Sequence, residues 1–101
     1  MNTKELIEKW ASGRKSFYFF LPDGPYGRPF DNQYLIDKVE EVNGDIIIKF
    51  KEGLALRFTG MVNVVDDGCN LLINNYNSCD LVINGSLGKS FDYGEVALSG
   101  F

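Results

Sequence analysis

The chain has 101 residues, of which 45% are hydrophobic and 14% aromatic, and this composition excludes a disordered chain and predicts one domain spanning residues 1–101. No apolar run approaches the roughly 18 residues that a membrane-spanning helix needs, and no basic region leads into an apolar stretch at the start. We therefore expect a cytoplasmic protein that does not bind or cross a membrane.

Charge is distributed unevenly along the chain, whose formal net charge is −4. Residues 1–57 contain nine bases and nine acids, whereas residues 58–101 contain one base, Lys89, and five acids. Nucleic-acid binding requires a basic stripe that displaces counterions from phosphates, and the sequence shows none. The acidic half fits a protein partner with a basic surface better, although acids on a β surface also serve solubility alone.

Residues 3–12 are predicted to form a short helix. Asn2 is placed to cap its N-terminus, and Gly13 is placed to end it. Ile7 and Trp10 lie on one face of this helix. We expect Trp10 to seal one end of a sheet core rather than to stack on a ligand.

Residues 16–21 are predicted to form a strand with aromatic side chains on both faces. Phe17 and Phe19 point to one face, and Tyr18 and Phe20 point to the other. Either both faces are covered by other elements, or one of them forms an exposed aromatic patch.

Residues 22–33 contain three prolines and two glycines, which exclude a helix or a central strand. We interpret this segment as a stiff loop built from two turns. Loops that are held rigidly on a scaffold often carry binding residues.

Residues 34–42 fit two interpretations, a helix with an apolar stripe or a strand that returns at Asn43-Gly44. Asn-Gly is a strong signal for a tight hairpin turn. We favour the strand, because a hairpin leading directly into Ile46 extends the sheet.

The clearest pattern in the chain lies between Asp45 and Thr59. If residues 51–53 form a three-residue hairpin loop with Gly53 in the left-handed conformation, three apolar pairs share one face of the hairpin. A two-residue loop would split this face, so the register is strongly determined. The expected pairs are Ile46 with Phe58, Ile48 with Leu56, and Phe50 with Leu54.

The C-terminal half is predicted to form short strands at residues 61–65, 71–74, 81–84 and 95–98, with breaks at 66–68, 75–78 and 85–88. This spacing is typical of an antiparallel meander. The predicted fold class is α+β, mainly β: an antiparallel meander forming a sandwich or partial barrel with one short N-terminal helix.

Patterns for catalysis and metal binding are missing. Cys69 and Cys79 lie outside any C-x-x-C motif and the chain has no histidine, so we expect free thiols, no zinc site and no nucleophile with a histidine base. Acids in turns, such as Asp66 and Asp67, are far more often turn formers than paired catalytic carboxylates or calcium ligands. We predict no enzyme activity, no cofactor and no metal.

The candidate binding site is the loop at residues 22–33 together with the tyrosine that follows it. Arginine and tyrosine often anchor protein interfaces, and aromatic rings beside Asp or Asn also suit a sugar. The competing interpretation is that a neighbouring carboxylate fixes the arginine and that the aromatic rings cap the end of the barrel. The candidate residues are Asp23, Tyr26, Arg28, Phe30, Asp31, Asn32 and Tyr34.

Residues 20–60 resemble a set of small bacterial proteins of unassigned activity. These proteins share a Gly-Arg-Pro-x-Asp-Asn segment ahead of β-strands, which is found here at residues 27–32. The resemblance implies a bacterial, mostly β protein, and it names no catalytic residue.

The function expected from the sequence is that of a non-enzymatic binding or accessory module acting through protein–protein contacts, as small acidic immunity-type proteins do. The alternative is a carbohydrate or small-ligand binding domain that uses residues 22–34. A hydrolase with paired carboxylates is the weakest of the three hypotheses, and the sequence does not predict an oligomeric state.

Overall fold

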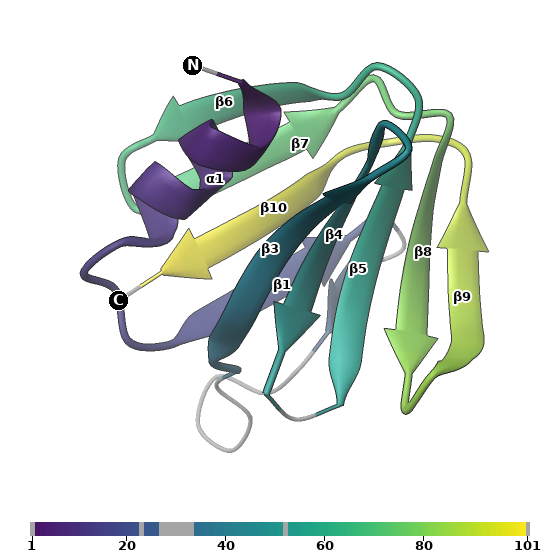
Figure 1. Ribbon diagram of the computed structural model, residues 1–101, viewed down its shortest axis with the longest axis horizontal. Coiled ribbons are helices and arrows are strands. Elements are labelled where there is room, and N and C mark those ends of the chain that lie inside the picture. The colour runs from purple at the N-terminus through teal and green to yellow at the C-terminus, as the bar shows by residue number, and fades with distance from the viewer. Residues whose placement is uncertain (1, 23, 27–33, 52, 101) are drawn as a thin grey trace.

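The computed structural model describes residues 2–22, 24–26, 34–51 and 53–100. Within these residues, two five-stranded antiparallel sheets pack as a sandwich, as expected, and one helix lies beside them (Figure 1). The first sheet has the order β2 (Gly24–Tyr26), β1 (Phe17–Leu21), β10 (Val96–Gly100), β7 (Asn70–Asn74) and β6 (Asn63–Asp67). The second sheet has the order β3 (Ile36–Val42), β4 (Asp45–Phe50), β5 (Leu54–Thr59), β8 (Ser78–Ile83) and β9 (Ser86–Phe91).

The chain passes back and forth between the two sheets. After β1 and β2 in the first sheet, β3, β4 and β5 form a meander in the second sheet. The hairpin of β6 and β7 then joins the first sheet, and the hairpin of β8 and β9 joins the second. Strand β10 finally inserts between β1 and β7, so that the last strand connects the earliest part of the chain to its middle.

The β4–β5 hairpin has the predicted register. Ile46 pairs with Phe58 and Ile48 pairs with Leu56, and all four side chains are buried. Gly53 has a φ angle of 83°, the left-handed conformation that the predicted loop requires. The predicted loop also includes Glu52, which lies outside the described residues. The apolar face of this hairpin forms much of the core contributed by the second sheet.

The ambiguous segment at residues 34–42 is a strand, as favoured, and the helical interpretation is excluded. Strand β3 pairs with β4 through the turn at Asn43 and Gly44, whose φ angles are 51° and 87°. Two left-handed residues in succession are typical of a tight hairpin whose twist matches its strands. Strand β3 is one of the two edge strands of the second sheet, and β9 is the other.

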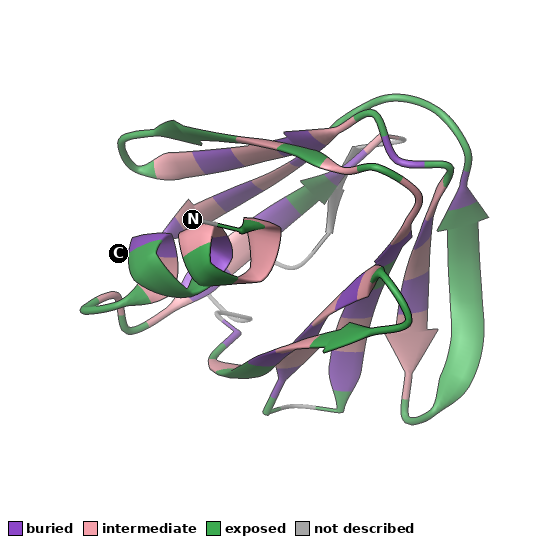
Figure 2. Cartoon of the chain, turned by 45° about the horizontal axis from the view of Figure 1, so that its top comes forward, coloured by how far each residue is buried: buried purple, intermediate pink, exposed green. Residues whose placement is uncertain are grey.

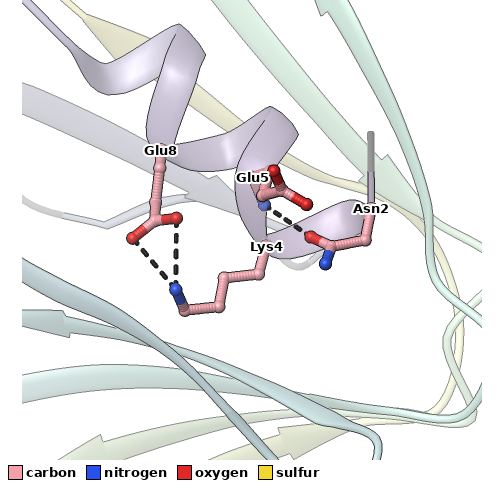
Figure 3. Close-up of polar contacts among 4 residues, drawn as sticks. All are labelled: Asn2, Lys4, Glu5 and Glu8. Carbon is pink, nitrogen blue, oxygen red and sulfur yellow. Dashed lines mark hydrogen bonds and ion pairs between the residues drawn. The ribbon is translucent and has the colours of Figure 1, made fainter.

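Helix α1 (Thr3–Ala11) is stabilised at its N-terminus by the predicted cap. The side-chain oxygen of Asn2 accepts a hydrogen bond from the backbone N–H of Glu5 at 2.8 Å (Figure 3). The ammonium group of Lys4 contacts both carboxylate oxygens of Glu8 at 3.2 Å, one turn further along the helix (Figure 3). Capping of this kind contributes about 1 kcal/mol to helix stability.

The helix closes one open side of the sandwich. It contacts β3 and β6, which are edge strands of different sheets, and lies between the two layers (Figure 2). Ile7 and Trp10 are buried against the core, which agrees with the sealing role expected for Trp10. The helix therefore supplies the apolar cover that the two sheet edges lack on this side.

Two strands lie where the sequence predicted loops. Strand β2 forms within residues 22–33, and it can accommodate Pro25 because it is an edge strand. The predicted break at residues 85–88 was wrong, because β9 begins at Ser86. The first five residues of β9 are exposed, so this strand has little of the apolar alternation on which the prediction depended.

Candidate functional site

Most of the binding site predicted from the sequence lies outside the described residues, namely Asp23, Arg28, Phe30, Asp31 and Asn32. The structure describes the backbone of Tyr26 and the whole of Tyr34.

The structure places the backbones of both described tyrosines of this set beside strand β1. Tyr26 pairs with Phe19 across the β1–β2 ladder. The ring of Tyr34 lies 5.2 Å from the ring of Phe19 and 6.0 Å from that of Phe50, and its residue is 8% exposed. Tyr34 is therefore a core residue at the corner where the chain passes from one sheet to the other.

A different surface emerges on the outer face of the first sheet. Cross-strand pairs align four apolar residues in one continuous line: Phe20 opposite Ala97, Ala97 opposite Leu72, and Leu72 opposite Val65. Along β1, β10 and β7 the neighbours of these residues are buried in the core, and in β6 Val64 packs against it, so the line faces outward. We call this line of Phe20, Ala97, Leu72 and Val65 the apolar row.

The two ends of the apolar row are the most accessible parts. Phe20 is 42% exposed and Val65 is 43% exposed, whereas Leu72 and Ala97 between them are half-buried. Strand β2 lies beside this end of the row, where the backbone of Pro25 pairs with that of Phe20. A sheet face with exposed apolar groups at both ends and a half-buried centre offers a shallow surface for another protein.

Polar and acidic groups flank the apolar row on both sides. On one side, Tyr18, Ser99, Asn70 and Asp67 form a second outward-facing line of directly paired residues. On the other side, Asn63 donates a hydrogen bond to Asn74 at 3.0 Å, and Asn74 donates one to Glu95 at 2.9 Å. Asp67 and Glu95 are exposed, so the rim of this surface carries negative charge.

The two sheets differ in how their charges are compensated. The residues assigned to the strands of the first sheet include Asp66 and Asp67 and contain no lysine or arginine. On the outer face of the second sheet, Lys49 contacts Glu40 at 2.7 Å, and the Arg57 guanidinium contacts the carboxylate of Asp45. The Lys49 ammonium group holds the pKa of the Glu40 carboxyl below its usual range. The outer face of the second sheet is thus largely neutralised by its own ion pairs, and that of the first is not.

The buried ionisable groups are structural. Burial raises the pKa of the Cys79 thiol to about 12, with a smaller contribution from the charge of Asp80, so the thiol is protonated at neutral pH. Burial also raises the pKa of Tyr76 to about 12, and its hydroxyl donates a hydrogen bond to the carbonyl of Tyr93 at 2.9 Å. Cys69 is exposed in the turn between β6 and β7, and both cysteines are free, as the sequence predicted.

Across the part of the chain that the structure describes, no group of three or more His, Cys, Asp and Glu side chains is arranged to hold a metal ion. Asp66 accepts a hydrogen bond from the backbone N–H of Gly68 at 3.1 Å, the usual role of an aspartate that initiates a turn. No helix among the described residues has the length and apolar character needed to cross a bilayer.

Sequence reasoning missed the apolar row because its members come from four separate strands. The outward direction of Phe20 was visible in the alternation of its own strand. Its alignment with Ala97 and Leu72 depends on β10 inserting between β1 and β7, which no local pattern indicates. Comparison of this chain with protein-family models, curated proteins and solved structures gives no match.

Proposed function

We propose that this protein is a non-enzymatic binding module that contacts a protein partner through the outer face of its first sheet. The observation that carries the proposal is the apolar row, which crosses four neighbouring strands between two polar flanks that each contain an acid, Asp67 on one side and Glu95 on the other. Apolar groups at the centre supply the area that is removed from water, and the charged rim selects the partner.

The charge of this face favours a partner with a basic surface. Asp67 and Glu95 lie at this face, and the strands of the first sheet contain no base. Two copies meeting through this face would bring like charges together, which is unfavourable in a desolvated interface. A basic partner would instead gain complementary pairs at the rim and associate faster at low salt.

An immunity-type role is the specific form of this proposal. A small acidic protein that covers a basic effector needs a rigid surface more than it needs catalytic groups. The sheet face meets this requirement because regular hydrogen bonding holds its backbone, so little conformational entropy is lost when it docks. An effector encoded by a neighbouring gene would be the first partner to examine.

The test compares two valines of matched exposure on different faces. Val65 is 43% exposed on the outer face of the first sheet, and Val42 is 44% exposed on edge strand β3 of the second sheet. Proteins captured from the native host by the wild type serve to identify a partner, which is then purified. Its dissociation constant is measured by calorimetry against the wild type, Val65→Glu and Val42→Glu.

We expect Val65→Glu to weaken binding by at least about tenfold, because it places a charge in an apolar contact, and Val42→Glu to change binding less than about twofold. Raising the salt concentration should weaken the wild-type complex. Equal effects of the two variants, or a captured protein whose affinity neither variant changes, would contradict the proposal that the partner binds the first sheet.

The alternative function, carbohydrate or small-ligand binding by residues 22–34, stays a prediction. Tyr34 is buried, so its ring has a structural role in the described fold. A glycan panel, run with wild type and Arg28→Ala, tests the rest of that loop. A saturable signal that Arg28→Ala abolishes would favour the sugar-binding hypothesis over the protein partner.

A further inference from the structure

A groove of about 370 Å³ lies between the C-terminal end of α1 and the start of β3. Its volume falls within the range of about 300–1,000 Å³ that small-molecule sites occupy. The groove shares no residue with the apolar row, so ligand binding in the groove does not depend on the proposed protein partner. The groove is lined by Glu8, Ala11, Ser12, Arg14, Lys15, Phe17, Leu35, Ile36, Asp37, Lys38, Val39 and Lys51.

The groove concentrates positive charge in a chain whose net charge is negative. Four bases line it, namely Arg14, Lys15, Lys38 and Lys51, and they come from three segments that are separate in the sequence. The acids in the lining are Glu8 and Asp37, and Glu8 is already paired with Lys4, which lies outside the lining. The fold therefore gathers an excess of positive charge here that an anion can neutralise.

Arg14 is held in place before any ligand arrives. Its Nε donates a hydrogen bond to the carbonyl of Trp10 at 2.8 Å, and its Nη2 donates one to the carbonyl of Gly68 at 2.9 Å. The guanidinium also lies over the Trp10 ring, 4.6 Å from its centroid. A guanidinium has five N–H donors, so others remain for a ligand, and a fixed side chain loses less entropy when it binds one.

Lys38 makes only a long ion pair outside the groove. It approaches Glu40 at 3.5 Å, whereas Lys49 contacts the other oxygen of the same carboxylate at 2.7 Å. Because Lys49 already compensates Glu40, Lys38 can turn towards an anion in the groove at small cost. Lys15 and Lys51 are exposed at the same site.

Five apolar residues also line the groove, of which Leu35 is the most exposed and Phe17 and Val39 are buried; the other two are Ala11 and Ile36. Apolar walls combined with a few charged groups are typical of sites for small organic molecules, because the walls provide contact area and the charges fix orientation. The register of β3 also shifts between Ile36 and Lys38, and such bulges re-aim side chains beside binding sites.

From this combination, we propose that the groove binds a small organic anion that has a phosphate or carboxylate head and an apolar or aromatic body. The basic side chains contact the head, and the apolar wall contacts the body. Inorganic phosphate alone would satisfy the first contact without the second, so it should bind more weakly.

The test is a titration of the ¹⁵N-labelled protein followed by amide chemical shifts. The probes are phenyl phosphate, benzoate, inorganic phosphate and, as a neutral analogue, benzyl alcohol. We expect phenyl phosphate or benzoate to produce saturable shifts at residues 11–15, 35–38 and 51. Inorganic phosphate should bind about tenfold more weakly, and benzyl alcohol should show no saturation. The tighter of the two aromatic anions identifies the preferred head group.

Matched lysine variants separate a built site from general attraction to charge. Lys15→Ala combined with Lys51→Ala should weaken binding by about tenfold or more, and because both side chains are exposed the fold should be retained. Lys9→Ala combined with Lys89→Ala removes two charges of the same type from exposed positions outside the lining, and it should change the affinity less than about twofold. Shifts that never saturate, or equal losses in the groove and control variants, would overturn the proposal.

Discussion

At the scale of single residues, the carbonyl of Gly68 ties the N-terminal helix to the first sheet. It accepts hydrogen bonds from the indole N–H of Trp10 at 3.0 Å and from the guanidinium of Arg14 at 2.9 Å. Gly100 packs against the same pair, since a Cβ at this position would meet Arg14, Phe17 and Trp10. The turn between β6 and β7 is therefore anchored by side chains more than 50 residues away in the sequence.

A second residue-scale feature is the buried thiol of Cys79, which predicts a loss of stability at alkaline pH. Burial raises its pKa from 9.0 to about 12, so the folded protein keeps a proton that the unfolded chain releases above about pH 9. The free energy of unfolding should then fall by about 1.4 kcal/mol per pH unit from this group as the pH rises from about 9 towards 12. Burial of Tyr76 adds to the loss above about pH 10.

Urea unfolding of the wild type and Cys79→Ala at pH 8, 9 and 10 measures this effect. The variant will be less stable at every pH because it creates a cavity, but its decline between pH 9 and 10 should be shallower. Cys69→Ala, in an exposed turn, provides the control and should decline as the wild type does. Parallel declines of Cys79→Ala and the wild type would show that the thiol contributes nothing to the pH dependence.

At the scale of secondary-structure elements, two hairpins of the second sheet require glycine for a left-handed backbone, and one of them also requires it for space. Gly44 and Gly53 both have positive φ angles, 87° and 83°. A Cβ at Gly44 would meet no atom, whereas a Cβ at Gly53 would collide with the side chain of Asn84 in the neighbouring β8–β9 turn. The backbone N–H of Asn84 also donates a hydrogen bond to the carbonyl of Gly53 at 2.8 Å, so the two turns pack closely.

This difference predicts unequal effects of two chemically identical substitutions. Gly44→Ala should cost about 1 kcal/mol from backbone strain alone. Gly53→Ala should cost about 1 kcal/mol more, because Asn84 must also move. Chemical denaturation of both variants measures the difference, and equal losses would mean that the contact between the turns can relax freely.

At the scale of the whole molecule, helix α1 links the two layers of the sandwich. It contacts β3 in the second sheet and β6 in the first, and Ile7 is fully buried between them. The helix thus covers apolar groups from both layers with one side of a nine-residue element. The groove that we propose as an anion site exists because the end of this helix lies beside the start of β3.

Shortening the Ile7 side chain should therefore destabilise both sheets. Ile7→Ala should destabilise the protein by about 2–5 kcal/mol. Amide hydrogen exchange should accelerate in β3 and in β6, whereas Lys9→Ala on the exposed side of the same helix should leave both strands protected. Faster exchange confined to one of the two strands would contradict the linking role.

The segregation of charge is also a property of the whole molecule. Ion pairs such as Lys49 with Glu40 neutralise the second sheet, and the first sheet is left with acids and a row of apolar groups. The sequence showed the acidic imbalance of residues 58–101, and the fold brings two acids of this region, Asp67 and Glu95, to the outer face of the first sheet. This surface is the basis of the proposed protein contact.

The sequence alone determined the elements whose physics is local. The Asn2 cap, the strand preference of residues 34–42 and the register of β4 with β5 follow from side-chain alternation and from which residues tolerate a left-handed backbone. These interactions involve residues close together in the chain, so a short window contains all the relevant information. The same Asn-Gly signal was present at Asn84 and Gly85, but the largely exposed strand that follows it lacks an apolar pattern.

The tertiary structure alone decided the strand order, and with it both candidate sites. Phe20 and Val65 lie on one surface because β10 and β7 stand between their strands, and Arg14, Lys38 and Lys51 surround one groove because α1 packs beside β3. Strand order results from burying the apolar faces of all the strands together, which is a property of the assembled core and not of any segment. The surfaces available for binding are set by that collective packing.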